Sequence, residues 1–136
     1  MLKGIVCALL LSNLCFAELT TSANAIIEAA VIRNVPREEL RPAFVKLLKS
    51  IRLAENGRPG REFGVLSHKA KTFEKQAGWC ASICYKNYVY WELHPKIDMD
   101  FISYLSTQYA PVGADNDPSN LNSHWVKNVK HFMEKL

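Results

Sequence analysis

The chain has 136 residues, of which 49% are apolar and 22% are charged. This length and composition exclude a disordered chain and favour one domain that buries a core of its own. The formal net charge of +4 at pH 7 suits an anionic polymer surface. It is too small for the dense basic patch of a nucleic-acid-binding protein, so no nucleic-acid partner is expected.

Residues 1–17 show the features of a secretory signal peptide in the usual order along the chain. Lys3 supplies a positive charge, the apolar stretch GIVCALLLSNLCF follows, and Cys15 and Ala17 are small residues at the positions that a signal peptidase reads. The apolar stretch is too short for a comfortable membrane span, and no later stretch is as long without charges. We therefore expect a signal peptide over 1–17 and a mature domain over 18–136 that is secreted or periplasmic, without a stable membrane span. A retained N-terminal anchor is the alternative.

Helical spacing of apolar residues begins after this segment. Residues 22–34 form the first such pattern, which Pro36 ends, and residues 37–40 form a short helical turn. Pro42 fits the first turn of the next helix, where its missing N–H does no harm. The apolar stripe of that helix recurs at intervals of three and four residues, as Phe44, Leu47, Leu48 and Ile51.

A longer helix is predicted over residues 70–91, and the sequence HPKID interrupts it. Asp98 or Asp100 can cap the following helix, which runs to Tyr109. The stretch APVGADNDPSN reads as an ordered loop, and Asn122 or Ser123 starts a last helix. Because no segment shows sustained strand alternation, the sequence predicts a mainly α single domain of about five helices, with ordered loops and little or no β structure.

Two cysteines, Cys80 and Cys84, remain after signal cleavage. Their spacing of four places both on one helix face, near the outer limit of disulfide geometry. They are interpreted either as packed thiols or as a strained disulfide, which an oxidising compartment would permit. No further Cys or His stands at a matching spacing, so neither a metal site nor a cofactor is predicted.

Glu55 occupies an unusual position at the end of the helix that contains Pro42. It continues the apolar stripe, and a helix C-terminus disfavours negative charge. Desolvation also raises the pKa of a carboxyl group, so both effects favour a neutral acid. A raised pKa suits a general acid for glycosidic cleavage. The alternative is a structural role in which Glu55 pairs with Arg58 or Arg61.

The stretch AENGRPGREFGVL resembles the active-site region of the lysozyme-like superfamily, especially small lytic transglycosylases and phage-type muramidases. Those proteins end an apolar helix with Glu and Ser/Asn-Gly, followed by a loop and a glycine turn, matched here by Glu55-Asn56-Gly57 and Gly64-Val65-Leu66. The ending YAPVGADNDPSNLNSHWVKNV is similar to theirs as well, and the two blocks span residues 44–129. The usual GLMQ turn is GVLS here, so its glutamine is missing, and Gln76 lies too far along the chain to replace it by motif.

The resemblance implies a lysozyme-like fold and peptidoglycan, or a related glycan, as the partner. It implies Glu55 as the catalytic acid and Tyr109 as a residue that helps to position it. The remaining residues implied at the substrate are Gly57, Phe63, Gly64, Asn116 and Trp125. A hydrolase would require a second carboxylate, and none of Glu62, Asp98 and Asp100 is convincing, which favours a transglycosylase.

Several interpretations stay open at this point. Trp79, Trp91 and Trp125 could stack on sugar rings, although core packing explains their helical spacing better. The aromatic stretch 85–91 could border a glycan groove or pack inside the domain. The alternatives to an enzyme are a non-catalytic exported glycan-binding or structural domain of the same fold, and a small secreted inhibitor or effector.

Overall fold

The computed structural model describes residues 22–136, and the signal-peptide prediction for 1–17 lies outside the described residues. The first helix covers residues 22–34 of this range. The later elements are η1 (Glu38–Leu40), α2 (Arg41–Glu55), α3 (Phe73–Leu93), α4 (Phe101–Tyr109), η2 (Leu121–His124) and α5 (Trp125–Lys135). Residues 22–136 contain no strand. The prediction of a mainly α domain of about five helices is therefore confirmed.

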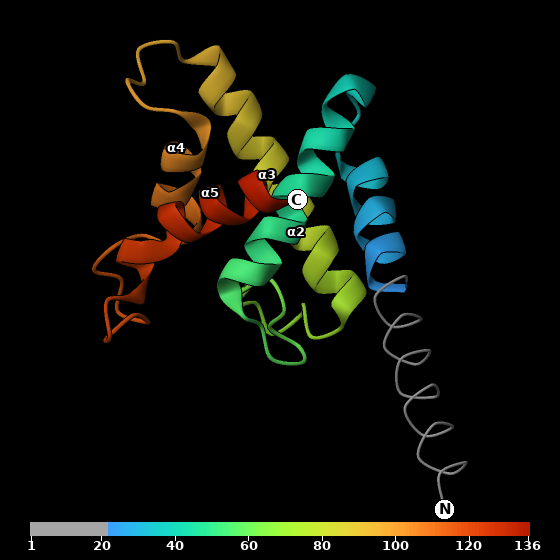
Figure 1. The fold of residues 1–136 in the computed structure, drawn as a ribbon, viewed down its shortest axis with the longest axis horizontal. Coiled ribbons are helices and arrows are strands. Elements are labelled where there is room, and N and C mark those ends of the chain that lie inside the picture. Colours follow the sequence, from blue (N-terminus) through green and yellow to red (C-terminus); the bar gives the residue numbers. More distant parts are fainter. Residues whose placement is uncertain (1–21) are drawn as a thin grey trace, which may run out of the picture.

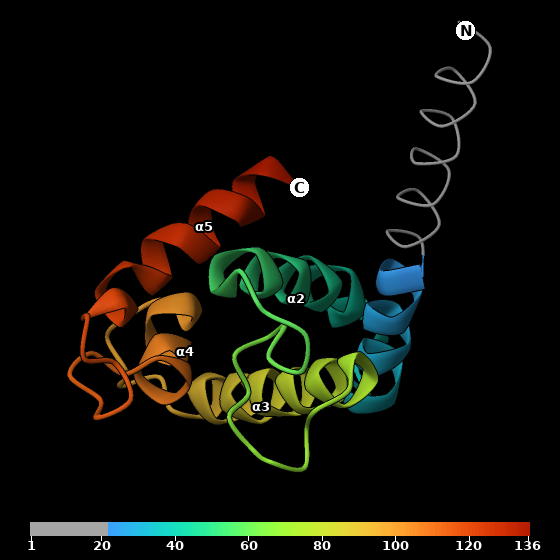
Figure 2. The same ribbon diagram turned by 90° about the horizontal axis from the view of Figure 1, so that it is seen from below.

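Helix α2 lies at the centre of the described chain (Figure 1). It contacts α3 and α5, and α4 contacts α3 and α5. Figure 2 shows α5 and α3 on opposite sides of α2, with the loop 56–72 beside the α2–α3 pair. Helix α2 therefore packs between α3 and α5, and its C-terminal end leads directly into the loop 56–72.

The stripe predicted on α2 faces the core. Phe44, Leu47, Leu48 and Ile51 are all buried, and the Phe44 ring packs edge-to-face on Tyr85 and Tyr88. The first helix adds its own apolar face to the same core cluster through Ile27, Ala30 and Val31. Burial of this continuous stripe holds α2, and with it the position of Glu55.

Helix boundaries follow local rules. Thr72 accepts a hydrogen bond from Lys75 N at the start of α3, and Asp100 accepts one from Ser103 N at the start of α4. Asn56 ends α2 in the left-handed conformation with φ 47°, as a helix stop requires. Gly57 does not share that conformation.

The predicted start of the last helix is corrected by the structure. Neither Asn122 nor Ser123 caps α5, because a 3-10 turn, η2, precedes it. Asp117 satisfies the free N–H groups at the start of η2 and accepts hydrogen bonds from Leu121 N at 2.8 Å and from Asn122 N at 3.0 Å. The cap thus comes from four residues upstream, in the loop.

Cys80 and Cys84 are buried free thiols. Their Sγ atoms lie 4.0 Å apart, about twice the length of an S–S bond. The two residues thus match the packed-thiol interpretation, and the structure contains no disulfide between them. Burial raises the pKa of Cys84 well above its ordinary value, which makes the reactive thiolate rare.

Candidate functional site

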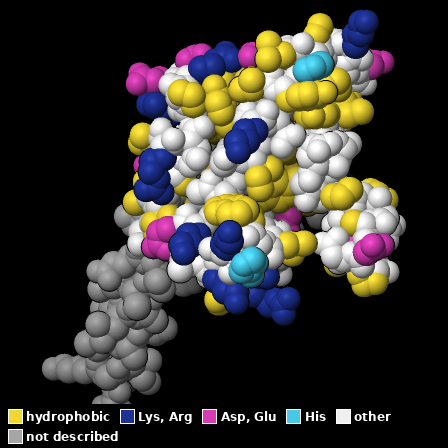
Figure 3. Space-filling view, turned by 180° about the vertical axis from the view of Figure 1, so that it is seen from behind, with side chains coloured by type: hydrophobic (Ala, Val, Ile, Leu, Met, Phe, Trp, Pro, Cys, Tyr) yellow, Lys and Arg dark blue, Asp and Glu magenta, His cyan; other side chains and the backbone are white. Residues whose placement is uncertain are grey.

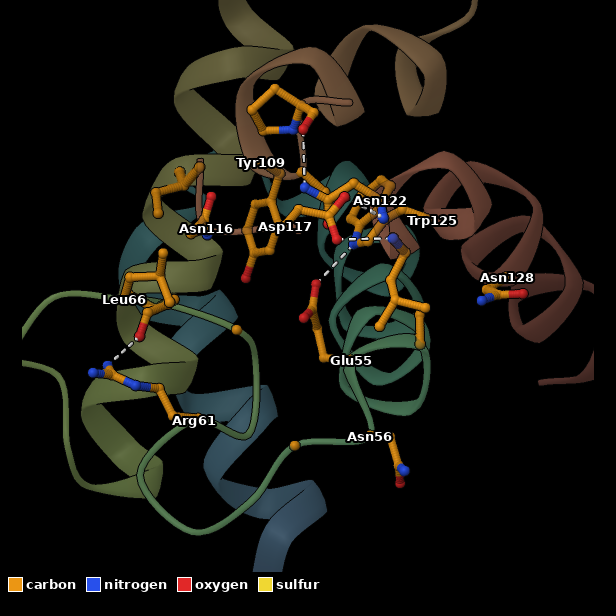
Figure 4. A pocket seen from close by; sticks show the side chains of 18 of the residues that line it. Glu55, Asn56, Arg61, Leu66, Tyr109, Asn116, Asp117, Asn122, Trp125 and Asn128 are labelled. Carbon is orange, nitrogen blue, oxygen red and sulfur yellow. Dashed lines mark hydrogen bonds between the residues drawn. The ribbon is translucent and has the colours of Figure 1, made fainter. Parts of the chain in front are cut away.

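A cleft of about 1000 Å³ opens at the C-terminal end of α2. Its walls come from the end of α2, the loop 56–72, α3, the end of α4, and the segment leading into α5. Figure 4 shows Glu55, Tyr109 and Trp125 pointing toward one another inside it, from three different helices. Segments far apart in the sequence therefore converge on one carboxyl group.

Glu55 is held in this cleft by an indole. Trp125 donates a hydrogen bond from Nε1 to Oε1 of Glu55 at 2.8 Å, and Trp125 is only 5% exposed. Burial raises the pKa of Glu55 above its ordinary value, and the hydrogen bond from Trp125 opposes part of that rise. The carboxyl group therefore keeps its proton to a higher pH than an exposed glutamate does. Its Oε2 has no hydrogen-bond partner among residues 22–136.

Gly64 lies directly against the carboxyl group of Glu55. A Cβ built on Gly64 would lie 2.6 Å from Cδ of Glu55, and the residue has a φ of 70°. A side chain at position 64 would therefore meet the carboxylate and strain the backbone as well. Only glycine allows the loop to approach the acid this closely.

Gln76 holds the Gly64 turn from beneath. This residue is fully buried on α3, and its Oε1 accepts hydrogen bonds from the N–H groups of Phe63 and Val65, both at 3.2 Å. Its Nε2 donates to Val65 O at 2.8 Å and to Ala70 O. One side chain thus binds the backbone on both sides of Gly64. Gln76 is 12 residues from Gly64 along the chain, which is too far for the usual turn motif, and packing of the loop onto α3 brings it to the turn.

Tyr109 contacts the same turn from α4. Its hydroxyl donates a hydrogen bond to Phe63 O, and its ring lies 5.5 Å from the ring of Trp125, with 30° between their planes. Burial raises the pKa of Tyr109 well above its ordinary value, so the hydroxyl remains a donor. Tyr109 therefore joins the loop to the indole that binds Glu55.

The other residues predicted at the substrate fall into two groups. Gly57, Gly64, Asn116 and Trp125 line the cleft. Gly57 is needed for packing, because a Cβ there would collide with the backbone of Glu62. Phe63 does not line the cleft, since its side chain is fully buried and packs against Phe73. The Phe63 side chain therefore does not reach the cleft, whereas its backbone binds Gln76 and Tyr109 beside Gly64.

Trp79 and Asp117 also belong to the cleft. Trp79, for which sugar stacking and core packing both stayed open, is 42% exposed and lines the cleft together with Leu66 and Ile83. Asp117 also lines the cleft, whereas Glu62, Asp98 and Asp100 do not. The DNDP stretch gave a signal for Asp117, because a carboxylate before Pro commonly fixes a turn. Each of its two oxygens already accepts a backbone N–H.

The ion-pair role considered for Glu55 is not found. Within residues 22–136, no Lys or Arg lies within salt-bridge distance of Glu55, and Nη1 of Arg61 donates to the carbonyls of Val65 and Ser67.

Residues 22–136 hold no group of His, Cys, Asp and Glu side chains that could bind a metal ion. Nor do they hold a helix long and apolar enough to cross a membrane.

Comparison of this chain with known family models, curated proteins and solved structures finds no match.

Proposed function

We propose that this chain is an exported glycosidase of the lysozyme-like type that cleaves peptidoglycan between its sugars. The observation that carries the proposal is Glu55, an acid with a raised pKa in a cleft large enough for several sugar rings. Sequence resemblance adds the substrate class. A neutral carboxyl group in a partly desolvated cleft is the form that a general acid requires.

Glu55 would act first as an acid and then as a base. Oε2 delivers its proton to the oxygen of the glycosidic bond while that bond breaks at the sugar carbon. The resulting carboxylate takes the proton of the attacking hydroxyl. In a transglycosylase that hydroxyl is the sugar's own, and a 1,6-anhydro ring forms. The hydrogen bond from Trp125 stabilises the carboxylate between the two steps.

The cleft offers one free carboxyl group, which favours the transglycosylase outcome. Asp117 is the only other carboxylate among the described cleft residues, and both of its oxygens are held by the start of η2. A hydrolase would need a second carboxylate free to activate water. Trp79, on α3, lines the same cleft and is partly exposed, so a sugar can stack on its ring.

Digestion of purified sacculi tests the proposal, with mass analysis of the soluble products. We expect anhydro sugar ends from the wild type and no products from Glu55→Gln. Reducing ends would instead indicate a hydrolase. If the sacculi stay intact but still bind the protein, the proposal of an enzyme fails, and the chain is a non-catalytic glycan-binding domain.

A further inference from the structure

The loop 56–72 carries positive charge on its outer side. It contains four Lys or Arg residues and one Glu, so its formal charge is +3 with His68 neutral. Its one carboxylate faces inward, because Oε1 of Glu62 accepts from Gly60 N at 3.0 Å and Oε2 is buried. Its exposed side chains include Arg58, His68, Lys69 and Lys71. The loop therefore presents cations, and no carboxylate, to solvent.

These cations have no acidic partner in the part of the chain that the structure describes. The ion pairs found there involve Arg37, Arg41 and Lys130, all outside the loop. Exposed basic residues on stable domains are commonly interspersed with acidic ones. An unbalanced cationic loop is a surface that attracts an anionic ligand.

The charged loop is continuous with the cleft. Arg58 and Arg61 line the cleft that holds Glu55. Arg61 also lines a second hollow of about 380 Å³, together with Pro59, Gly60 and Lys71. Helix α3 begins at Phe73, just after Lys71, so the positive end of its dipole adds to this field. In Figure 3, Lys and Arg side chains gather at the lower edge, the height at which Figure 1 draws this loop.

We propose that this basic loop binds the carboxylates of peptide stems beside the glycan strand that Glu55 cuts. The inference rests on the proposed function and names the part of peptidoglycan that the loop recognises. Stem peptides branch from the sugar chain and carry free carboxylates, so a strand lying in the cleft brings them close to Arg58 and Lys71. Uncharged amino-sugar polymers lack these groups and gain nothing from the loop.

Charge reversal on the loop tests this inference. The test variant is Lys69→Glu/Lys71→Glu, and the matched control is Lys86→Glu/Lys96→Glu, which makes the same charge change at exposed positions outside the cleft. The substrates are sacculi free of phosphodiester polymers and the same glycan strands after amidase removal of their peptides. At low salt we expect the test variant to cleave intact sacculi about tenfold more slowly, as loss of two exposed charge contacts implies. Cleavage of peptide-free strands should not change, and the control should resemble the wild type on both substrates.

Added salt should reduce the wild-type preference for intact sacculi, because exposed charge pairs are screened. Equal losses on both substrates, or no loss on intact sacculi, would overturn the inference. Co-sedimentation with the two substrates is measured in parallel. If the wild type cleaves neither substrate, the proposed function fails, and binding alone decides the inference. If the wild type co-sediments with intact sacculi and the charge-reversed variant does not, the inference is supported. If the wild type co-sediments equally with intact sacculi and with peptide-free strands, the inference is overturned.

Discussion

The carboxyl group of Glu55 and the backbone of Gly64 are in direct contact, with no room for a side chain between them. A Cβ at position 64 would lie 2.6 Å from Cδ of Glu55. The contact joins the end of α2 to the loop that follows it. Together with the indole of Trp125 at 2.8 Å, it fixes the direction in which the acid faces.

Replacement of Gly64 by Ala should disturb both stability and activity. A left-handed backbone costs a non-glycine residue roughly 1–2 kcal/mol, and the collision with Glu55 must be relieved in addition. We expect Gly64→Ala to lower the free energy of unfolding by more than about 2 kcal/mol and to abolish glycan cleavage. Urea unfolding and sacculus digestion measure the two effects.

Two other glycines provide controls for this variant. Gly113 has a φ of 79° with nothing near its Cβ position, so Gly113→Ala measures the backbone cost alone. Gly78 lies inside α3 and also has open space, so Gly78→Ala should stabilise the protein by up to about 1 kcal/mol. If Gly64→Ala and Gly113→Ala cost the same free energy, the contact between Gly64 and Glu55 contributes nothing to stability.

Glu55→Gln separates catalysis from folding. The amide cannot donate a proton as an acid, so glycan cleavage should fall by on the order of 10²–10⁴ or more. The amide oxygen can still accept the hydrogen bond from Trp125, so the circular dichroism spectrum should not change. A variant that digests sacculi at the wild-type rate would end the catalytic role of this residue.

The same variant predicts a pH dependence of stability. The pKa of Glu55 is raised in the folded state above its ordinary value of 4.5, so the folded protein binds that proton more tightly than the unfolded chain does. The contribution of Glu55 to the free energy of unfolding is therefore fully present below pH 4.5. It decreases as the pH rises through the pKa of Glu55 in the folded protein. Glu55→Gln should therefore have a higher melting temperature than the wild type at neutral pH and no such advantage at pH 4. A difference of equal size at both pH values would contradict the burial effect on this group.

Trp125→Phe should move the pH profile of the reaction. Loss of the indole N–H removes the contact that lowers the pKa of Glu55, so the acid should stay protonated to higher pH. We expect the alkaline limb of the rate profile to shift upward and stability to decrease by on the order of 1–3 kcal/mol. Trp91→Phe is the control, because Trp91 donates to Met99 O, outside the cleft. A shift of the alkaline limb in both variants would assign the effect to stability rather than to Trp125.

Gln76→Leu should be among the most destabilising single substitutions in this domain. It leaves the buried N–H groups of Phe63 and Val65 without an acceptor, and each unsatisfied group costs about 1–3 kcal/mol. We expect a loss of about 3 kcal/mol or more in chemical unfolding. Gln108→Leu, at an exposed position, should change stability by less than about 0.5 kcal/mol. Equal effects of the two changes would show that Gln76 does not hold the loop.

The two cysteines predict a simple chemical result. Cys80 and Cys84 are buried and unbonded, so alkylation should require denaturant. Addition of a reductant should leave the melting temperature unchanged. A clear decrease on reduction would reveal a disulfide between residues 80 and 84.

Local patterns were sufficient to predict which segments are helical and that Glu55 ends α2, although not where every helix begins. The apolar stripe through Phe44 and Ile51 leads directly to Glu55. Burial of Glu55 raises the pKa of its carboxyl group, as the sequence predicts. Asp100 and Pro42 also stand where capping and first-turn rules place them. These features depend on neighbours within a few residues, which a sequence displays.

The contacts that complete the site could not be predicted in this way. Trp125 meets Glu55 across 70 residues of chain, and Tyr109 meets Phe63 across 46. Helical spacing gives a face without saying what covers it, so it favoured core packing for Trp79. Phe63 was placed at the substrate by the family resemblance, which gives no packing direction for a loop residue. Trp79 faces the cleft, where part of its ring stays exposed, whereas Phe63 turns inward beside Gln76.

The two hydrogen bonds to Gln76 give the loop a rigidity that its glycine-rich sequence does not suggest. Loop amides normally exchange their hydrogens with solvent quickly, because local opening exposes them at little cost. The amides of Phe63 and Val65 bind a buried side chain of α3, so they can open only when the loop separates from that helix. Their exchange should accordingly be as slow as that of the core of α3, while the amide of Arg58, at an exposed position of the same loop, exchanges rapidly.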